Sequence, residues 1–232
     1  MNCEIQHGDA RELADAITGP INCIIADPPY GVDFVSRKGV LPSAARFARK
    51  IENDGNIESA IELWSDVITR LTAKTPDDAE MYLFTKWDII EPWANALRAL
   101  APIGWKYKML LVWEKGYPGL GDIDANWGCG HELILYAKKG RRDVAERRSG
   151  VLHFDKPSTK GHIHPTEKPV ALLERLIEMS TDPGDLVVDP FAGSGSTIVA
   201  AQNLGRRGIG FEIDATYAKG AAERLDQPTM AF

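Results

Sequence analysis

The chain has 232 residues, a formal net charge of −6 and a hydrophobic content of 44%, which suffices for one α/β domain with a sizeable core. Its cysteines, Cys3, Cys23 and Cys129, have no paired spacing, which argues against a disulfide framework or a zinc ribbon and fits a reducing cytoplasm. The first residues do not resemble a signal peptide, and no apolar run approaches the roughly 20 residues that span a bilayer. We therefore expect a cytoplasmic protein without a membrane partner.

Apolar runs and helical spacings alternate along the chain. Short apolar runs predict strands at 4–6, 21–26, 81–84, 106–113, 132–137, 186–188 and 209–211. Apolar residues three or four apart predict helices at 57–71, 88–100, 169–179, 196–204 and 217–225. The strands 106–113 and 132–137 are separated by a glycine-rich stretch and suggest a widened hairpin. This alternation predicts an α/β fold, with a doubly wound, mostly parallel sheet in a single domain over 1–232.

A carboxylate, two prolines and an aromatic ring follow the buried run 21–26, in the order Asp27, Pro28, Pro29 and Tyr30. The Asp27 carboxylate and the Pro28 carbonyl can each accept an N–H from an exocyclic amine, and the prolines fix the backbone that aims these acceptors. Tyr30 offers a ring face on which the base can stack. A base inside a duplex cannot reach such a pocket, so the target must be flipped out. The alternative is a plain turn at the end of a strand, which Asp-Pro and Pro-Pro both favour.

A second apolar run, 186–188, leads into a glycine-rich loop and a helix, the order of nucleotide-binding α/β units. The loop reads Asp189-Pro190-Phe191-Ala192-Gly193-Ser194-Gly195-Ser196-Thr197. It is neither a dinucleotide fingerprint, because Ile198 stands where a third glycine is needed, nor a phosphate-binding loop, because it has no lysine. Glu212 ends the next strand about 20 residues further on, where a carboxylate can accept both ribose hydroxyls of a nucleoside cofactor. A solvated strand end is the alternative for Glu212.

Several further segments, together with these two motifs, resemble the DNA amino-methyltransferases that use S-adenosylmethionine. They are His7-Gly8-Asp9, Leu111-Val112-Trp113-Glu114-Lys115, His131-Glu132-Leu133-Ile134-Leu135-Tyr136, His164-Pro165-Thr166-Glu167-Lys168-Pro169, Pro183-Gly184-Asp185 and Leu204-Gly205-Arg206-Arg207. The segment with Asp27 precedes the glycine loop, which is the permuted order of the family's beta class. Ser196 stands where the family commonly has threonine, and both residues offer a hydroxyl.

The resemblance implies a Rossmann-like methyltransferase fold of the seven-stranded type and a methyl transfer to adenine N6 by direct attack. It implies catalytic roles for Asp27, Pro28, Pro29 and Tyr30. It places Asp9 near the adenine of the cofactor and Thr166 and Lys168 near its methionine part. The full set expected to bind S-adenosylmethionine is Asp9, Thr166, Lys168, Asp189, Phe191, Gly193, Ser194, Gly195, Thr197 and Glu212.

Two basic blocks predict contacts with double-stranded DNA despite the negative net charge, because phosphate neutralisation dominates duplex binding. They lie in expected DNA-contacting loops at 31–56 and 138–162, and the first loop is long for a plain connector. The first block is Arg37, Lys38, Arg46, Arg49 and Lys50, against the single acid Asp33. The second is Lys138, Lys139, Arg141, Arg142, Arg147 and Arg148, against Asp143 and Glu146. The alternative for both blocks is a solvated surface.

Three alternatives stay open from the sequence. Transfer to cytosine N4 is the nearest, although the family more often pairs that activity with serine where Asp27 stands. A catalytically idle DNA-binding subunit of the same fold is the second, and RNA as the substrate is the third. A homodimer is open as well. His153, His162 and His164 do not form a metal site with any cysteine or carboxylate spacing, so no metal is expected.

Overall fold

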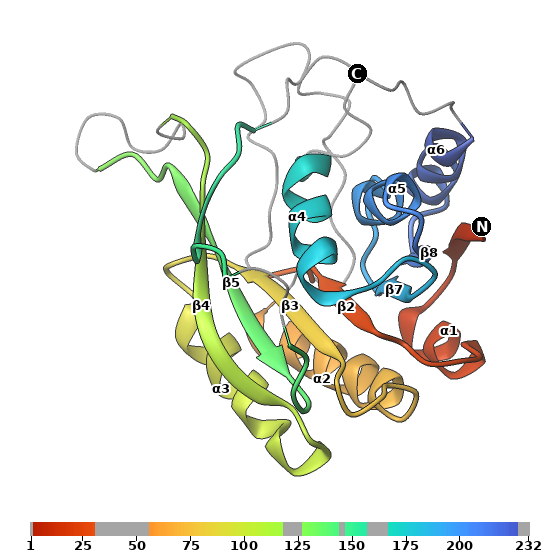
Figure 1. Cartoon of the computed structure of the whole chain (residues 1–232), viewed down its shortest axis with the longest axis horizontal. Helices are drawn as coiled ribbons and strands as arrows, with labels where there is room; N and C mark the ends of the chain where they lie inside the picture. Colours follow the sequence, from red (N-terminus) through yellow and green to blue (C-terminus); the bar gives the residue numbers. More distant parts are fainter. Residues whose placement is uncertain (1, 31–55, 118–126, 144–146, 157–166, 227–232) are drawn as a thin grey trace.

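The computed structural model describes residues 2–30, 56–117, 127–143, 147–156 and 167–226, and these residues contain one eight-stranded sheet (Figure 1). The order across the sheet is β1-β8-β7-β2-β3-β5-β4-β6. The strands are β1 (Cys3–His7), β2 (Cys23–Ala26), β3 (Glu80–Thr85), β4 (Lys106–Glu114), β5 (His131–Lys138), β6 (Val151–His153), β7 (Leu186–Asp189) and β8 (Arg207–Glu212).

Among the described strands, β5 alone runs against the direction of the others. The pairs β1–β8, β8–β7, β7–β2, β2–β3 and β4–β6 are parallel, whereas β5 is antiparallel to both β3 and β4. The carboxyl ends of the other strands therefore meet at one edge of the sheet, called here the carboxyl edge, and the opposite edge is the amino edge. The expected doubly wound, mostly parallel sheet and the hairpin-like pairing of β4 with β5 are confirmed.

Helices cover both faces of the sheet (Figure 1). They are α1 (Ala10–Ala16), α2 (Ile57–Thr72), α3 (Ile90–Ala99), the short 3₁₀ helix η2 (Ala101–Ile103), α4 (Val170–Ser180), α5 (Ser196–Asn203) and α6 (Ala215–Leu225). Successive side chains of a strand point to opposite faces. In β2, Ile24 and Ala26 pack with the cluster that contains α1, α2 and α3, whereas Cys23 and Ile25 pack with α4 and α5. This is why β2 is apolar throughout.

The predicted elements agree with the structure to within a few residues, with three omissions, namely α1, η2 and β6. Helix α1 was not expected, because its sequence Ala-Arg-Glu-Leu-Ala-Asp-Ala has a weak apolar stripe. It begins at Ala10, and the side chain of the preceding Asp9 accepts a hydrogen bond from the Arg11 backbone N–H and caps the helix. Strand β6 was not expected either, because its three residues are too few for a periodic signal. It adds an eighth strand to the expected seven-stranded type.

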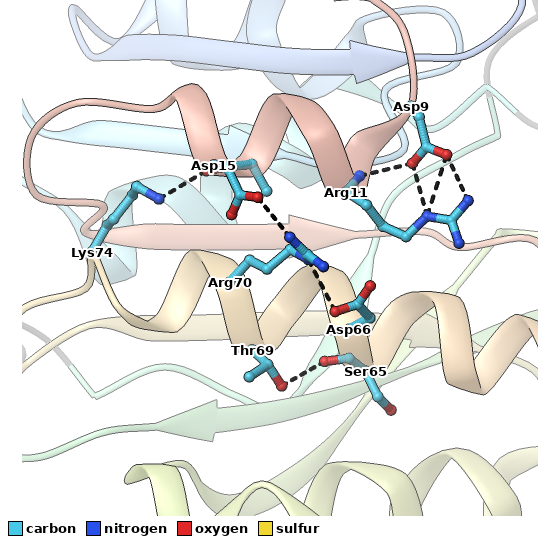
Figure 2. A network of polar contacts seen from close by, with 9 residues as sticks. Asp9, Arg11, Asp15, Ser65, Asp66, Thr69, Arg70 and Lys74 are labelled. Carbon is cyan, nitrogen blue, oxygen red and sulfur yellow. Dashed lines mark hydrogen bonds and ion pairs between the residues drawn. The ribbon is translucent and has the colours of Figure 1, made fainter.

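Ion pairs on the surface join α1 to α2, as Figure 2 shows. Arg70 of α2 lies 2.6 Å from Asp15 of α1 and 3.0 Å from Asp66 of its own helix. Lys74 donates a hydrogen bond to the Ala14 carbonyl at 3.0 Å. These side chains are largely solvated, so each pair contributes about 0–1 kcal/mol, and the apolar packing between the helices holds them in place.

A buried charge lies at the amino edge. Glu80, the first residue of β3, is 0% exposed. Its carboxylate accepts a hydrogen bond of 2.5 Å from the Ser180 hydroxyl and lies 2.8 Å from the Lys138 ammonium. The Tyr82 hydroxyl shares a hydrogen bond of 2.6 Å with Ser180. This cluster fastens the end of α4 to β3 and β5, and it neutralises a carboxylate that could not be buried alone.

None of the helices in the described part of the chain is long and apolar enough to cross a membrane.

Replacing Lys138 by methionine is expected to lower the free energy of unfolding by about 3–5 kcal/mol, because Glu80 is left buried without a counter-charge. Lys138→Met combined with Glu80→Gln should recover most of that loss, since no charge then remains. Urea unfolding measures both variants, and Lys108→Met on the exposed side of β4 is the control. A loss in Lys138→Met no larger than in the control would contradict the structural role.

Candidate active site

The carboxyl edge brings together residues that are far apart in the sequence. Asp9 follows β1, Glu212 ends β8, Asp189 ends β7 and Asp27 follows β2. The strand order makes these positions neighbours, since β8 lies between β1 and β7, and β7 lies between β8 and β2. Ligands of open parallel sheets bind at this edge, in the crevice beyond the strand ends. The predicted catalytic segment and the glycine loop therefore lie side by side at this edge.

Asp27 is held from two sides. The Tyr30 hydroxyl donates a hydrogen bond of 2.5 Å to its Oδ1 atom, and the Lys168 ammonium lies 2.5 Å from its Oδ2 atom. A carboxylate has about four lone-pair positions, so both oxygens can still accept an N–H from a ligand. The two contacts fix the direction in which these free positions point, which is the preorganisation an acceptor needs.

Tyr30 is fixed by the same contact. Its hydroxyl is bound to Asp27, and the Lys86 ammonium lies 5.4 Å from the centre of its ring. Burial raises the pKa of Tyr30, and the nearby carboxylates of Asp27 and Glu132 raise it further, so the phenol keeps its proton and acts as a donor. Stacking of a base on Tyr30 stays a prediction, and holding Asp27 is a role the sequence did not indicate.

Lys168 is 9% exposed on its side chain and has two carboxylate partners. Besides Asp27, it lies 3.3 Å from Glu132 Oε2, and Lys115 lies 2.6 Å from Glu132 Oε1. Burial by itself lowers the pKa of Lys168, but Asp27 and Glu132 outweigh burial and raise it. Burial likewise raises the pKa of Glu132, and Lys168 and Lys115 outweigh it and lower the pKa. Both groups are therefore charged at neutral pH.

Lys168 was expected to bind the methionine part of a cofactor. The structure places its ammonium on the predicted catalytic carboxylate, so a cofactor contact would come in addition to this ion pair or in exchange for it. Glu132 belongs to one of the segments that resemble the family, and the sequence indicated no role for it. No local pattern pairs the start of β5 with the residue before Pro169, and only the fold brings Glu132 to Lys168.

The glycine loop turns sharply between β7 and α5. Gly193 and Gly195 have φ values of 51° and 75°, which L side chains rarely adopt. A Cβ atom on Gly195 would also lie 3.0 Å from the Ala221 side chain of α6. The backbone N–H of Gly193 points at Glu212 and donates a hydrogen bond of 2.9 Å to its Oε2 atom. The loop and the carboxylate predicted to act together are thus in direct contact.

Glu212 and Asp189 are the acids of this half of the site. Glu212 Oε1 accepts a hydrogen bond of 2.8 Å from the Asp214 N–H, and burial raises the pKa of Glu212. Asp189 is 5% exposed and accepts a hydrogen bond of 3.0 Å from the Phe191 N–H. Burial raises the pKa of Asp189 to about 7, against the hydrogen bonds from Thr197 and Phe191 that lower it.

Arg224 of α6 connects the loop to the segment that carries Lys168. Its guanidinium lies 2.9 Å from the Glu167 carboxylate, 3.1 Å from the Ser196 hydroxyl and 3.3 Å from the Ser194 carbonyl. Glu167 directly precedes Lys168, so this contact ties both expected cofactor segments to one helix. Sequence reasoning missed Arg224, which lies in an ordinary amphipathic pattern.

Asp9 lies at the carboxyl edge as expected, but its carboxylate is engaged within the protein. It accepts hydrogen bonds from the backbone and guanidinium of Arg11, with a shortest distance of 2.6 Å (Figure 2). These hydrogen bonds hold the pKa of Asp9 below its usual value. A role near the adenine of a cofactor stays a prediction, and Thr166 lies outside the described residues.

The structure describes only one of the two basic blocks that were predicted to contact DNA. The first, Arg37, Lys38, Arg46, Arg49 and Lys50, lies outside the described residues. The second begins at the amino edge and not at the carboxyl edge, because β5 runs antiparallel and Lys138 pairs with Glu80. Lys138 is therefore about 17 Å along the strand from the level of Leu133 and Thr85. The start of this block therefore lies at the edge of the sheet opposite Asp27.

Several residues of the second block also contact acceptors of the protein itself. Lys138 pairs with Glu80, Lys139 donates to the Thr75 carbonyl, and Arg142 lies 2.6 Å from Asp182. Of the other three residues of this block, Arg141 pairs with Asp143, Arg148 lies 3.4 Å from Glu178, and Arg147 is exposed. A DNA contact by this block stays a prediction without support from its position.

The residues described in the structure contain no group of histidine, cysteine and carboxylate side chains arranged to hold a metal ion.

Comparison with known proteins identifies the family. A family model described as DNA methylase matches residues 21–223. The chain belongs to the DNA methylase family. The amino-methyltransferase resemblance read from the motifs is thereby confirmed.

Relatives match this methylase over most of its length. The type II methyltransferase M2.DpnII of Streptococcus pneumoniae is 54% identical over 240 residues, covering 89% of this chain and 82% of the relative. The DNA adenine methyltransferase YhdJ of Escherichia coli strain K12 is 29% identical over 262 residues, covering 96% and 82%. Among solved structures, the M1.HpyAVI-SAM complex is 26% identical with a TM-score of 0.72, and the match covers 97% of this chain and 99% of that one.

The raised pKa of Asp189 predicts a pH dependence of stability in this methylase. The pKa of this carboxyl is about 7 in the folded protein and about 3.9 in the unfolded chain. Its contribution to the free energy of unfolding is therefore fully present below about pH 4 and is lost as the pH rises through 7. Between pH 5 and 8 this amounts to about 2–3 kcal/mol. Asp189→Asn, which resembles the protonated acid, should remove that part of the pH dependence. Urea unfolding of both proteins at pH 5 and 8 measures it, and parallel profiles would contradict the assignment.

Proposed function

We propose that this methylase transfers a methyl group from S-adenosylmethionine to N6 of an adenine flipped out of double-stranded DNA at specific sites. The observation that carries the proposal is the Asp27 carboxylate, held by Tyr30 and Lys168 at the carboxyl edge beside the glycine loop and Glu212. The similarity to a relative named DNA adenine methyltransferase supports adenine as the target.

The residues of the glycine-loop half fit a cationic nucleoside cofactor. Glu212 offers carboxylate oxygens for ribose hydroxyls, Asp189 can become negative near a sulfonium, and the loop has no lysine for phosphate. S-adenosylmethionine supplies an electrophilic methyl group when bound. The complete set proposed to hold it is Asp9, Thr166, Lys168, Asp189, Phe191, Gly193, Ser194, Gly195, Thr197 and Glu212.

The residues of the chain that would take part in the chemistry itself lie at residues 27–30, after β2. An exocyclic amine conjugated with a ring is a poor nucleophile, and acceptors on its N–H groups localise the lone pair on nitrogen. Asp27 and the Pro28 carbonyl would act as these acceptors, with Pro29 shaping the turn and Tyr30 beneath the base. The oriented Asp27 carboxylate stabilises positive charge as it develops on the attacking nitrogen, and the attack needs no covalent enzyme intermediate.

Double-stranded DNA is the proposed macromolecular partner, with the first basic block on the phosphates next to the flipped base. Duplex binding requires such local positive charge even in an acidic protein. A homodimer and a cytoplasmic location remain predictions, and the free Cys3, Cys23 and Cys129 accord with a reducing compartment.

Replacing Asp27 by alanine is expected to slow methyl transfer on the order of 10²-fold or more at saturating cofactor, because one preorganised acceptor at the reacting nitrogen is lost. The affinity for S-adenosylmethionine should change little. Single-turnover assays on duplex DNA measure the rate, and mass spectrometry of the digested DNA identifies the methylated base. N4-methylcytosine as the product would establish the cytosine alternative, and an inactive wild-type protein would favour the idle DNA-binding subunit.

Replacing Glu212 by alanine is expected to weaken S-adenosylmethionine binding by about 1.5–3 kcal/mol, the range for hydrogen bonds to a charged group. DNA affinity without the cofactor should stay almost unchanged. Isothermal titration calorimetry measures the cofactor affinity, with Glu223→Ala on the exposed face of α6 as a control. Glu212→Gln tests whether the charge is needed, since it retains one acceptor for the Gly193 N–H. Equal affinities for wild type and Glu212→Ala would remove Glu212 from the site.

A further inference from the structure

Four charged side chains form an alternating chain that ends at the proposed catalytic acceptor. Lys115 lies 2.6 Å from Glu132, Glu132 lies 3.3 Å from Lys168, and Lys168 lies 2.5 Å from Asp27. These residues come from four separate segments: Lys115 follows β4, Glu132 lies in β5, Lys168 precedes α4 and Asp27 follows β2. The fold thus assembles this chain at the carboxyl edge, where no local motif could produce it.

The contact between Glu132 and Lys168 is electrostatic. The Glu132 Oε2 atom is buried without a hydrogen bond, although the Lys168 ammonium lies within ion-pair distance. A buried carboxylate oxygen without a hydrogen bond is costly unless a charge compensates it. Its cost is offset here by the neighbouring ammonium, so the position of Glu132 is tied to the position of Lys168.

Lys168 is shared between two carboxylates. An ammonium has three N–H donors. Because Glu132 attracts the ammonium from one side, it influences the direction in which the N–H nearest Asp27 points. With Glu132 present, part of the positive charge of Lys168 is balanced by a second anion. Without it, Lys168 would be the counter-ion of Asp27 alone among the contacts described, and the negative charge available to a substrate amine would fall.

We propose that Glu132 is a positioning residue for methyl transfer, which holds the Lys168 ammonium so that Asp27 keeps its orientation and its strength as an acceptor. This inference rests on the proposed function, because it assigns Asp27 to the amine of the base. Glu132 itself does not touch the substrate in this scheme. It acts through Lys168, and Lys115 fixes it from the opposite side.

The first test is Glu132→Gln, which removes the charge and keeps the shape. The single-turnover rate at saturating S-adenosylmethionine is expected to fall at least about 10-fold, with the dissociation constants for cofactor and DNA within about 3-fold of wild type. Glu114→Gln is the matched control, since Glu114 ends β4 opposite His131 at the same edge and should leave the rate within about 2-fold. A purely structural role would instead lower the melting temperature and weaken both binding steps together.

The second test asks whether Glu132 acts through Lys168. The rate of the double variant Glu132→Gln with Lys168→Met should equal that of Lys168→Met alone, because the positioning residue has nothing left to hold. Multiplying effects would overturn the proposal. If Glu132→Gln does not fold, Glu132→Asp keeps the charge but withdraws it by one methylene, and a full wild-type rate in that variant would equally overturn it.

The outcomes separate this inference from the proposed function. A wild-type protein that methylates no DNA base would refute the proposed function itself. A wild-type protein that methylates adenine, with Glu132→Gln equally fast, would refute only the role of Glu132.

Discussion

The common direction of the strands β1, β8, β7, β2 and β3 is the constraint on which the candidate site depends. Because parallel strands end at the same edge, residues more than 180 positions apart, such as Asp27 and Glu212, come to lie on one rim. The glycine loop fits between them because β7 is the direct neighbour of both β8 and β2. The proposed cofactor site and the proposed base site therefore lie next to each other on this rim.

Buried charges occur at both edges of the sheet, and their surroundings differ. At the amino edge, Glu80 is fully buried and engaged by Ser180 and Lys138, which joins α4 to the sheet. At the carboxyl edge, Asp27 is engaged by Tyr30 and Lys168 but is only partly buried, so lone pairs remain for a ligand. The same type of ion pair thus stabilises the fold at one edge and orients an acceptor at the other.

Charge distribution has to be read from the fold as well as from the sequence. The second basic block looked like a phosphate-binding strip, yet Lys138 and Arg142 are paired with Glu80 and Asp182 at the edge opposite Asp27. These lysine and arginine side chains neutralise the negative charge of acidic residues of the protein itself, so less of their positive charge is available to a nucleic acid. The first basic block, within 31–56, lies outside the described residues, and its contact with phosphates stays a prediction.

Local sequence determined most elements, the two motifs and the family. Apolar periodicity and the Asp-Pro-Pro-Tyr and glycine-loop segments depend only on neighbouring residues, which is why they could be read directly. Helix α1 and strand β6 were missed because their apolar signals are weak or short. The tertiary structure alone decided the direction of β5, the pairing of Lys168 with Asp27 across 141 positions and the place of Glu132. Strand direction and ion-pair partners depend on contacts between distant segments, and no local pattern of residues specifies them.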